Sequence, residues 1–279
     1  MHRRNNDIWR RSRQLKTGRA GKGPIVYWMS RDQRVYDNWA LLWAQQEGMI
    51  HEKNILVVFC LTPNFPDTNP AQVTFMAKGI PTLDRELEQL NIGLATLKGT
   101  PDAVLPQLLA NLDAHSLLSD FNPLTTHTIW QDKLADEITI PFYEVDSHNI
   151  IPAWTTSNKK EYAAYTIRPK IKRLLDDYLT DIPILTAHPY PFTSTRPKEH
   201  DNELAHTLLK DTAPLTLPIA SGVTEAIKAA RQFTQTHLKH YGSKRNDPCQ
   251  NGQSGLSPYL HFGQLSAQRL ARMVLDLHM

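Results

Sequence analysis

Between residues 24 and 146, short apolar runs alternate with segments of helical periodicity, and this alternation limits the possible fold most. The run at 55–59, Ile-Leu-Val-Val-Phe, has no apolar–polar alternation, as expected for a parallel strand covered by helices on both faces. The predicted strands lie at residues 25–29, 55–59, 92–97, 117–121 and 142–146. Strands that alternate with helices predict an α/β fold, a Rossmann-like doubly wound parallel sheet of five strands.

The helices expected between these strands follow the spacing of apolar residues and the capping signals. A break at Gly79 to Pro81 is predicted to divide the second helix. The polar, Pro-closed loop at 146–154 leaves the carboxyl end of the last strand, where such sheets bind ligands. The expected helices cover residues 35–46, 69–90, 100–115 and 126–137.

After residue 146 the strand signals end and only helices are expected. A helix is predicted at 169–179, and an apolar stripe that follows Ser221 begins a second unit, which continues to a last helix opened by Ser266. The sequence therefore predicts four parts. They are a basic N-terminal arm at 1–23, an α/β domain at 24–155, a helical connector with a Pro-rich linker at 156–220, and the beginning of an all-helical domain at 221–279.

The N-terminal arm carries eight Lys or Arg residues against one acid, Asp7. Such a segment can touch phosphates non-specifically. Because it lacks apolar periodicity, we expect a solvated, partly disordered leader. The chain has neither the apolar segment of a secretory signal nor a membrane-length apolar run, so a cytoplasmic protein without membrane contact is expected. An organelle presequence, which is rich in Arg and poor in acids, is the alternative for the arm.

The turn after the first predicted strand, residues 29–34, contains no glycine. A nicotinamide dehydrogenase would have G-x-G-x-x-G there, so that class is disfavoured. Ser30, Arg31 and Arg34 could bind an anion at this turn or form an ordinary solvated helix start. The histidines and the two cysteines show no metal-ligand spacing and no disulfide framework, so no metal is expected.

A stronger anion site is predicted near the end of the chain. Ser254, Gly255, Leu256 and Ser257 precede a proline, and the hydroxyl-rich turn at Ser266 opens the last helix. Free backbone N–H groups and helix dipoles at two such turns suit the pyrophosphate of a dinucleotide. Read by itself, however, Ser-Pro at the start of a helix is also a common cap.

Several segments, in order along the chain, resemble the class II cyclobutane pyrimidine dimer photolyases of the photolyase/cryptochrome superfamily. The similar segments are YWMSRDQRVYDNWALLWA (27–44), DFNPL (120–124), EVDSHNIIPAW (144–154), KEYAAYTIRPK (160–170), RNDP (245–248) and GLSPYLHFGQLSAQR (255–269). The resemblance covers nearly all of residues 24–275. The ordered set is far more specific than any one of its members.

The resemblance implies a light-driven DNA repair lyase that splits pyrimidine dimers by electron transfer from excited, reduced FAD. It implies a flipped-out dimer in UV-damaged DNA as the partner, a monomeric enzyme, and an antenna chromophore, a deazaflavin or a folate, in the α/β domain. By this resemblance Tyr241 and the turn Ser254, Gly255, Leu256 and Ser257 contact FAD, and Arg245 lies near the DNA lesion.

The resemblance also implies that helices enclosing the flavin follow the segment present here. We therefore expect a truncated chain that holds no catalytic residue, binds FAD weakly or not at all, and is inactive alone. Two alternatives remain. One is a cryptochrome-like blue-light photoreceptor, and the other is a stand-alone nucleotide-binding α/β module, for which residues 200–279 would be dispensable.

Overall fold

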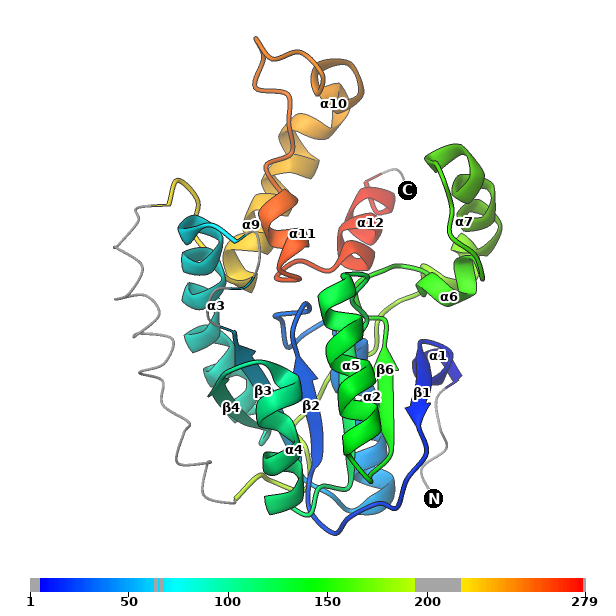
Figure 1. Ribbon diagram of the computed structural model, residues 1–279. Coiled ribbons are helices and arrows are strands. Elements are labelled where there is room, and N and C mark those ends of the chain that lie inside the picture. Colours follow the sequence, from blue (N-terminus) through cyan, green and yellow to red (C-terminus); the bar gives the residue numbers. More distant parts are fainter. Residues whose placement is uncertain (1–5, 63–64, 66–67, 194–216, 278–279) are drawn as a thin grey trace.

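The computed structural model describes residues 6–62, 65, 68–193 and 217–277. Its centre is one six-stranded sheet of order β1-β6-β5-β2-β3-β4, in which only β1 runs antiparallel to its neighbour (Figure 1). The order reverses between β2 and β5, the topological switch point of a doubly wound sheet. The strands are β1 Ser12–Lys16, β2 Ile25–Met29, β3 Ile55–Leu61, β4 Gly93–Lys98, β5 Ser116–Asp120 and β6 Phe142–Val145.

Helices cover both faces of the sheet, and a further group of helices stands beyond the carboxyl ends of its strands (Figure 1). The helices of the first part are α1 Asn6–Trp9, α2 Trp39–His51, α3 Pro70–Gln89, α4 Pro101–Asn111 and α5 Thr125–Glu137. Those of the second part are α6 Ala153–Thr156, α7 Ala164–Tyr178, α9 Val223–Gln232, the π-helix η1 Phe233–His237, α10 Leu238–Lys244, α11 Ser257–His261 and α12 Ala267–Leu275.

Successive residues of β2 enter two different cores, because side chains alternate across a strand. Ile25, Tyr27 and Met29 pack with α2 and α3 on one face. Val26 and Trp28 pack with α4 and α5 on the other face. All five side chains of β2 are buried, which explains the uninterrupted apolar run in the sequence.

The basic N-terminal segment was expected to be a solvated, partly disordered leader, and for the residues that the structure describes this expectation is wrong. Its residues 12–16 form β1, which pairs with β6 and adds a sixth strand to the expected five. β1 is a half-exposed edge strand without an apolar face, and its partner is supplied by a strand more than a hundred residues away, so the local sequence carried no strand signal. Residues 1–5 of the predicted arm lie outside the described residues.

Two other boundaries differ from the prediction. α3 runs unbroken through Pro81, because the buried Ile80, Leu83 and Leu87 on one face outweigh the single hydrogen bond that a proline removes. α7 begins at Ala164, before Pro169, and α9 takes Gly222 rather than Ser221 as its N-cap.

The C-terminal helices form a third core of their own. Phe233 of η1, Leu256 and Tyr259 are buried in it, and Phe75 of α3 packs against them, so this unit lies on the α/β domain. In the predicted linker, Leu185 and His188 are buried against the first domain, whereas residues 194–216 lie outside the described residues. These helices form an orderly packed unit, which counts against the stand-alone module.

Candidate functional site

The turn that follows β2 is occupied by the chain's own carboxylate. The backbone N–H groups of Ser30, Arg31 and Asp32 donate to Oδ2 of Asp120, at 2.8, 2.8 and 3.1 Å, and the Tyr27 hydroxyl donates to Oδ1 at 2.5 Å. Burial, together with the nearby charge of Asp32, raises the pKa of Asp120 to about 6 although these hydrogen bonds oppose the shift. A phosphate cannot use amides that Asp120 already occupies, so the backbone of this turn is not an anion site.

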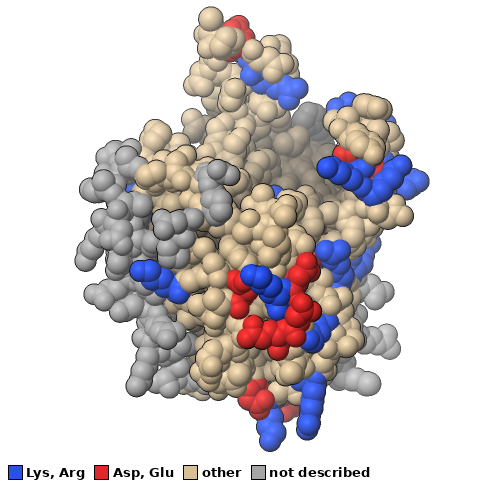
Figure 2. All heavy atoms as spheres, in the orientation of Figure 1, with Lys and Arg blue, Asp and Glu red and all other residues tan. Residues whose placement is uncertain are grey.

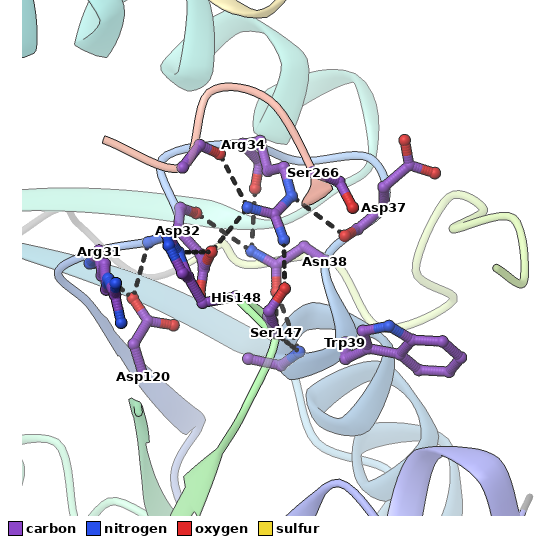
Figure 3. A network of polar contacts seen from close by, with 12 residues as sticks. Arg31, Asp32, Arg34, Asp37, Asn38, Trp39, Asp120, Ser147, His148 and Ser266 are labelled. Carbon is purple, nitrogen blue, oxygen red and sulfur yellow. Dashed lines mark hydrogen bonds and ion pairs between the residues drawn. The ribbon is translucent and has the colours of Figure 1, made fainter. Parts of the chain in front are cut away.

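The guanidinium of Arg34 is also occupied by hydrogen bonds within the protein, and these bonds join three segments of the chain (Figure 3). Its Nη1 donates to Asp32 Oδ1 at 2.6 Å and to the carbonyl of Gly263 at 2.8 Å, while Nη2 donates to the carbonyl of Ser147 at 2.7 Å. Burial of Asp32 would raise its pKa, but Arg34 and His148 hold that pKa at about 2. The predicted solvated helix start is therefore a buried loop, and α2 begins only at Trp39.

A second cation links the same loop to α12. Arg269 donates from Nε to Oδ2 of Asp37 at 2.9 Å and from Nη2 to Oδ1 at 2.5 Å. Ser266, which is 3% exposed, caps α12 by accepting from the N–H of Arg269 at 3.2 Å. The Ser266 turn is thus satisfied internally and packed on the first domain, so it does not join the Ser254–Ser257 turn in one anion site as the sequence had suggested.

Arg11 extends this contact between the two domains and was not recognised from the sequence. Its guanidinium donates to the carbonyl of Tyr178 at 3.0 Å and to Oε1 of Gln268 at 3.1 Å, and it lies 4.3 Å from the centre of the Trp39 ring. Burial lowers the pKa of Arg11 to about 10, which leaves it charged at neutral pH. A lone arginine in a basic segment gives no signal that distinguishes it from its solvated neighbours.

The predicted flavin turn, residues 254–257, lies on the outer side of the third core. Ser254 is half-buried, and Gly255 and Ser257 are exposed. Gly255 has φ +68°, and no heavy atom lies within 4 Å of the place where a Cβ would stand, so a ligand can approach this backbone closely. Leu256, in contrast, buries its side chain in the core and donates its N–H to Ser254 Oγ at 3.3 Å, so it could contact a ligand only through its backbone.

Tyr241 lies in α10, and Arg245 follows the last residue of that helix, at the start of the loop that leads to this turn. The half-buried Tyr241 ring packs edge-on against Phe233 at 5.2 Å, and the exposed Arg245 guanidinium lies 5.6 Å from the Tyr241 ring centre. Arg245 and Gln253 line one hollow of about 410 Å³. The structure therefore brings the predicted DNA-contacting residue close to the residue that precedes the predicted flavin turn.

The donor set of this region fits a dinucleotide diphosphate in part. Two serine hydroxyls and an open glycine backbone are groups that bind phosphate oxygens, although α11 has only five residues and contributes little dipole.

Among the described residues, no cluster of His, Cys, Asp or Glu could hold a metal ion. Within the same part of the chain, no helix has the length and apolar character needed to cross a bilayer.

Comparison with known proteins extends over both domains. The family model of DNA photolyase matches residues 25–191. The deoxyribodipyrimidine photo-lyase of Potorous tridactylus is 38% identical over 248 residues, which is 88% of this chain and 47% of that protein. The enzyme of the same name from Arabidopsis thaliana is 36% identical over 89% of this chain and 52% of its own length.

Solved structures show the same fold. A bacterial class III photolyase from Agrobacterium tumefaciens superimposes with a TM-score of 0.68 at 22% identity, covering 95% of this chain and 55% of the other. An archaeal photolyase from Sulfolobus tokodaii, solved with two FAD molecules, gives a TM-score of 0.66 at 17% identity, with coverages of 89% and 54%. The chain spans about half the length of the curated relatives it matches. With its mostly parallel, doubly wound sheet and a family match over more than half of its residues, the chain belongs to the DNA photolyase family.

Proposed function

We propose that this chain provides the α/β domain and the first helices of the cofactor domain of a light-driven lyase that splits pyrimidine dimers in UV-damaged DNA. The observation that carries the proposal is the extent of the similarity. Relatives named deoxyribodipyrimidine photo-lyase match 88–89% of the chain, far more than the α/β domain alone. The class II assignment rests on the ordered sequence segments.

The cofactor proposed is FAD, which when bound would supply the light-excited electron for dimer splitting. On the protein side, the hydroxyls of Ser254 and Ser257 and the open backbone at Gly255 would hold the diphosphate. The Tyr241 ring would lie against the cofactor beside them. Arg245, exposed at the edge of the 410 Å³ hollow, would contact the DNA next to the dimer. An antenna chromophore in the α/β domain is proposed from the family alone.

The buried contacts between the domains would give this chemistry its geometry. Arg34 and Arg269 fix α12 and the loop before it on the carboxyl end of the sheet. Groups that must exchange an electron or bind one ligand have to be held at a fixed separation, and rigid elements do this better than loops. These residues would act through position and would touch neither flavin nor DNA.

The proposal is tested by binding and by repair. The purified chain is titrated with FAD and, as a control, with FMN, which lacks the diphosphate bridge and the adenosine. Any binding is expected to be weak, with FAD preferred over FMN. A dimer-containing oligonucleotide is then irradiated with blue light in the presence of the chain and reduced FAD. Dimer loss in the light beyond that seen with reduced FAD alone, and none in the dark, would support the proposed reaction and would contradict the expectation that the chain is inactive alone. Equal affinity for FAD and FMN would contradict the assigned flavin turn.

A cryptochrome-like photoreceptor is the second candidate. A chloroplast and mitochondrial cryptochrome DASH of Arabidopsis thaliana is 30% identical, but over only 36% of this chain. A photoreceptor would bind flavin without preferring damaged over undamaged DNA. The ratio of the two DNA affinities therefore separates the candidates.

A further inference from the structure

The segment from Ser157 to Arg173 concentrates positive charge on the outside of the molecule. It contains six Lys or Arg residues and one acid, Glu161, which is paired with Lys170 at 2.5 Å. The side chains of Arg168, Lys172 and Arg173 are exposed, and no hydrogen bond or ion pair joins them to any described residue. The two acids of α7, Asp176 and Asp177, lie in its last turn near Lys172 and Arg173, but no ion pair joins them to these cations, and six basic residues still outnumber them. Figure 2 shows the resulting group of basic side chains over α7, at the upper right.

Two tyrosines lie among these cations. Tyr162 and Tyr165 are 89% and 76% exposed, the two most exposed large apolar or aromatic side chains of α7 and its approach. Tyr165, Arg168 and Lys172 follow one another at helical spacings of three and four, so they share one face of α7. A solvated charged face has no need for exposed aromatic rings, whereas surfaces that bind nucleic acid combine the two.

The position of α7 adds a geometric argument. α7, α10 and α12 all stand beyond the same end of the sheet (Figure 1). The chain just after α7 is fixed to α12, because Gln268 donates to the carbonyl of Thr180 at 2.7 Å and Arg272 pairs with Asp181 at 2.7 Å. The cations of α7 are thus held in a fixed place on the side of the molecule that also carries Arg245.

We infer that the exposed face of α7 binds the sugar–phosphate backbone of duplex DNA at a distance from the dimer, with Arg168, Lys172 and Arg173 on phosphates and the two tyrosines on adjacent sugars. This inference rests on the proposed function, and it assigns part of the DNA contact to a helix outside the cofactor domain. A membrane surface is the poorer match. A helix that lies on lipid needs a broad exposed apolar face, and Ile171, 37% exposed, is the one large aliphatic side chain of α7 that is exposed.

The test compares two triple variants of the full chain that change net charge equally. R168Q/K172Q/R173Q removes the cations of α7, and K22Q/K78Q/K98Q removes three exposed lysines elsewhere. Affinity for an undamaged duplex is measured by fluorescence anisotropy over a range of salt concentrations. Every phosphate that the protein ceases to neutralise lowers the slope of log K against log salt by about 0.9, so the slope should fall by up to about 2.7 in the α7 variant and by little in the control.

The tyrosines give an independent variant. Y162A/Y165A should weaken duplex binding while leaving the salt slope unchanged, because the rings release no counterions. An equal fall in slope in both triple variants, no fall in either, or no binding of duplex by the unchanged chain would overturn the inference. It would also be overturned if the α7 variant altered only the sedimentation mass or the binding to anionic vesicles.

The same titrations separate this inference from the proposed function. Preference for a dimer-containing duplex tests the function, whereas the salt slope on undamaged duplex tests the α7 surface. A chain whose slope falls in the α7 variant but which never prefers the dimer would support the surface and contradict the repair function. If the chain prefers the dimer and the α7 variant keeps both the affinity for duplex and the salt slope of the unchanged chain, the repair function is supported and the α7 surface is contradicted.

Discussion

The carboxylate of Asp37 accepts two parallel hydrogen bonds from the guanidinium of Arg269, at 2.9 and 2.5 Å, and so joins the loop after β2 to the first turn of α12. Asp37 adopts φ +57°, a backbone conformation that costs a non-glycine residue energy. The pair raises the pKa of Arg269, chiefly through the hydrogen bonds to Asp37. Two residues more than two hundred positions apart thereby fix the position of α12 on the first domain.

Replacing Arg269 by Gln should lower the free energy of unfolding by about 1 kcal/mol. The pair is bidentate, but the arginine side chain is 42% exposed, so solvent screening keeps its contribution near the upper end for surface pairs. Urea unfolding measures the change. Arg272→Gln is the matched control, since its partner Asp181 is 89% exposed and a change of only a few tenths of a kcal/mol is expected. An equal loss of stability in both variants would contradict a special role for Asp37.

Replacing Arg34 by Met should be far more damaging, at about 3–5 kcal/mol, because Asp32 would lose its arginine partner in the interior and keep only the contact with His148. The double variant R34M/D32N removes the Asp32 charge as well, and it should recover part of the loss. Urea unfolding of the two variants gives the comparison. If the double variant R34M/D32N were less stable than R34M, the Asp32 charge could not be the cause of the stability lost in R34M.

Arg11 offers a test of the link between β1 and α12. Arg11→Met removes the hydrogen bonds to Gln268 and Tyr178 but keeps an apolar chain over Trp39, so the free energy of unfolding should fall by about 2–3 kcal/mol. Hydrogen exchange should show faster exchange in α12 as well as in β1. Arg19→Met, in the exposed loop after β1, is the control and should leave both unchanged. Faster exchange confined to β1 would show that the two elements are not coupled.

These contacts also explain which features the sequence could and could not predict. The parallel strands were recognisable because burial on both faces requires uninterrupted apolar runs such as 55–59. β1 was missed because its stability comes from β6 and from one buried arginine, neither of which leaves a local pattern. Arg34 looked like an anion ligand because the sequence shows its charge but not Asp32, Gly263 and Ser147 folded around it.

His127 should destabilise the protein as the pH is lowered below about 6.5, while Asp120, whose pKa burial raises to about 6, should act in the opposite direction. The His127 ring is buried against Trp28, and burial lowers its pKa from an ordinary value of 6.5 to about 4. The unfolded chain therefore takes up a proton at this position that the folded chain refuses, and stability is lost between about pH 6.5 and 4. The loss from this residue should reach about 3 kcal/mol.

His127→Gln should remove this loss, so that the variant loses less stability than the unchanged chain between pH 7 and pH 4, and urea unfolding at pH 7, 6, 5 and 4 would measure the difference. Some slope should remain, because burial also lowers the pKa of His115 and of His188. His240→Gln, on the exposed surface of α10, serves as the control and should keep the full profile. An unaltered slope in His127→Gln would show that this ring does not govern the acid response.

Gly255 provides the sharpest test of the proposed flavin turn. Its φ of +68° favours glycine, and the space where a Cβ would stand is open, so Gly255→Ala has no steric clash and strains the backbone by only about 1–2 kcal/mol. If the diphosphate of FAD lies against this backbone, the added methyl group should weaken FAD binding by more than the loss in the free energy of unfolding can explain.

Gly242→Ala is the control, since Gly242 lies in α10 next to Tyr241, has open space around it and has no positive φ. Titration followed by flavin fluorescence should show weaker FAD binding for Gly255→Ala only, with binding of FMN little affected in both variants. Equal FAD affinity in the two variants would place the diphosphate elsewhere, and Ser254 would then serve only the hydrogen bond from the Leu256 N–H within the turn.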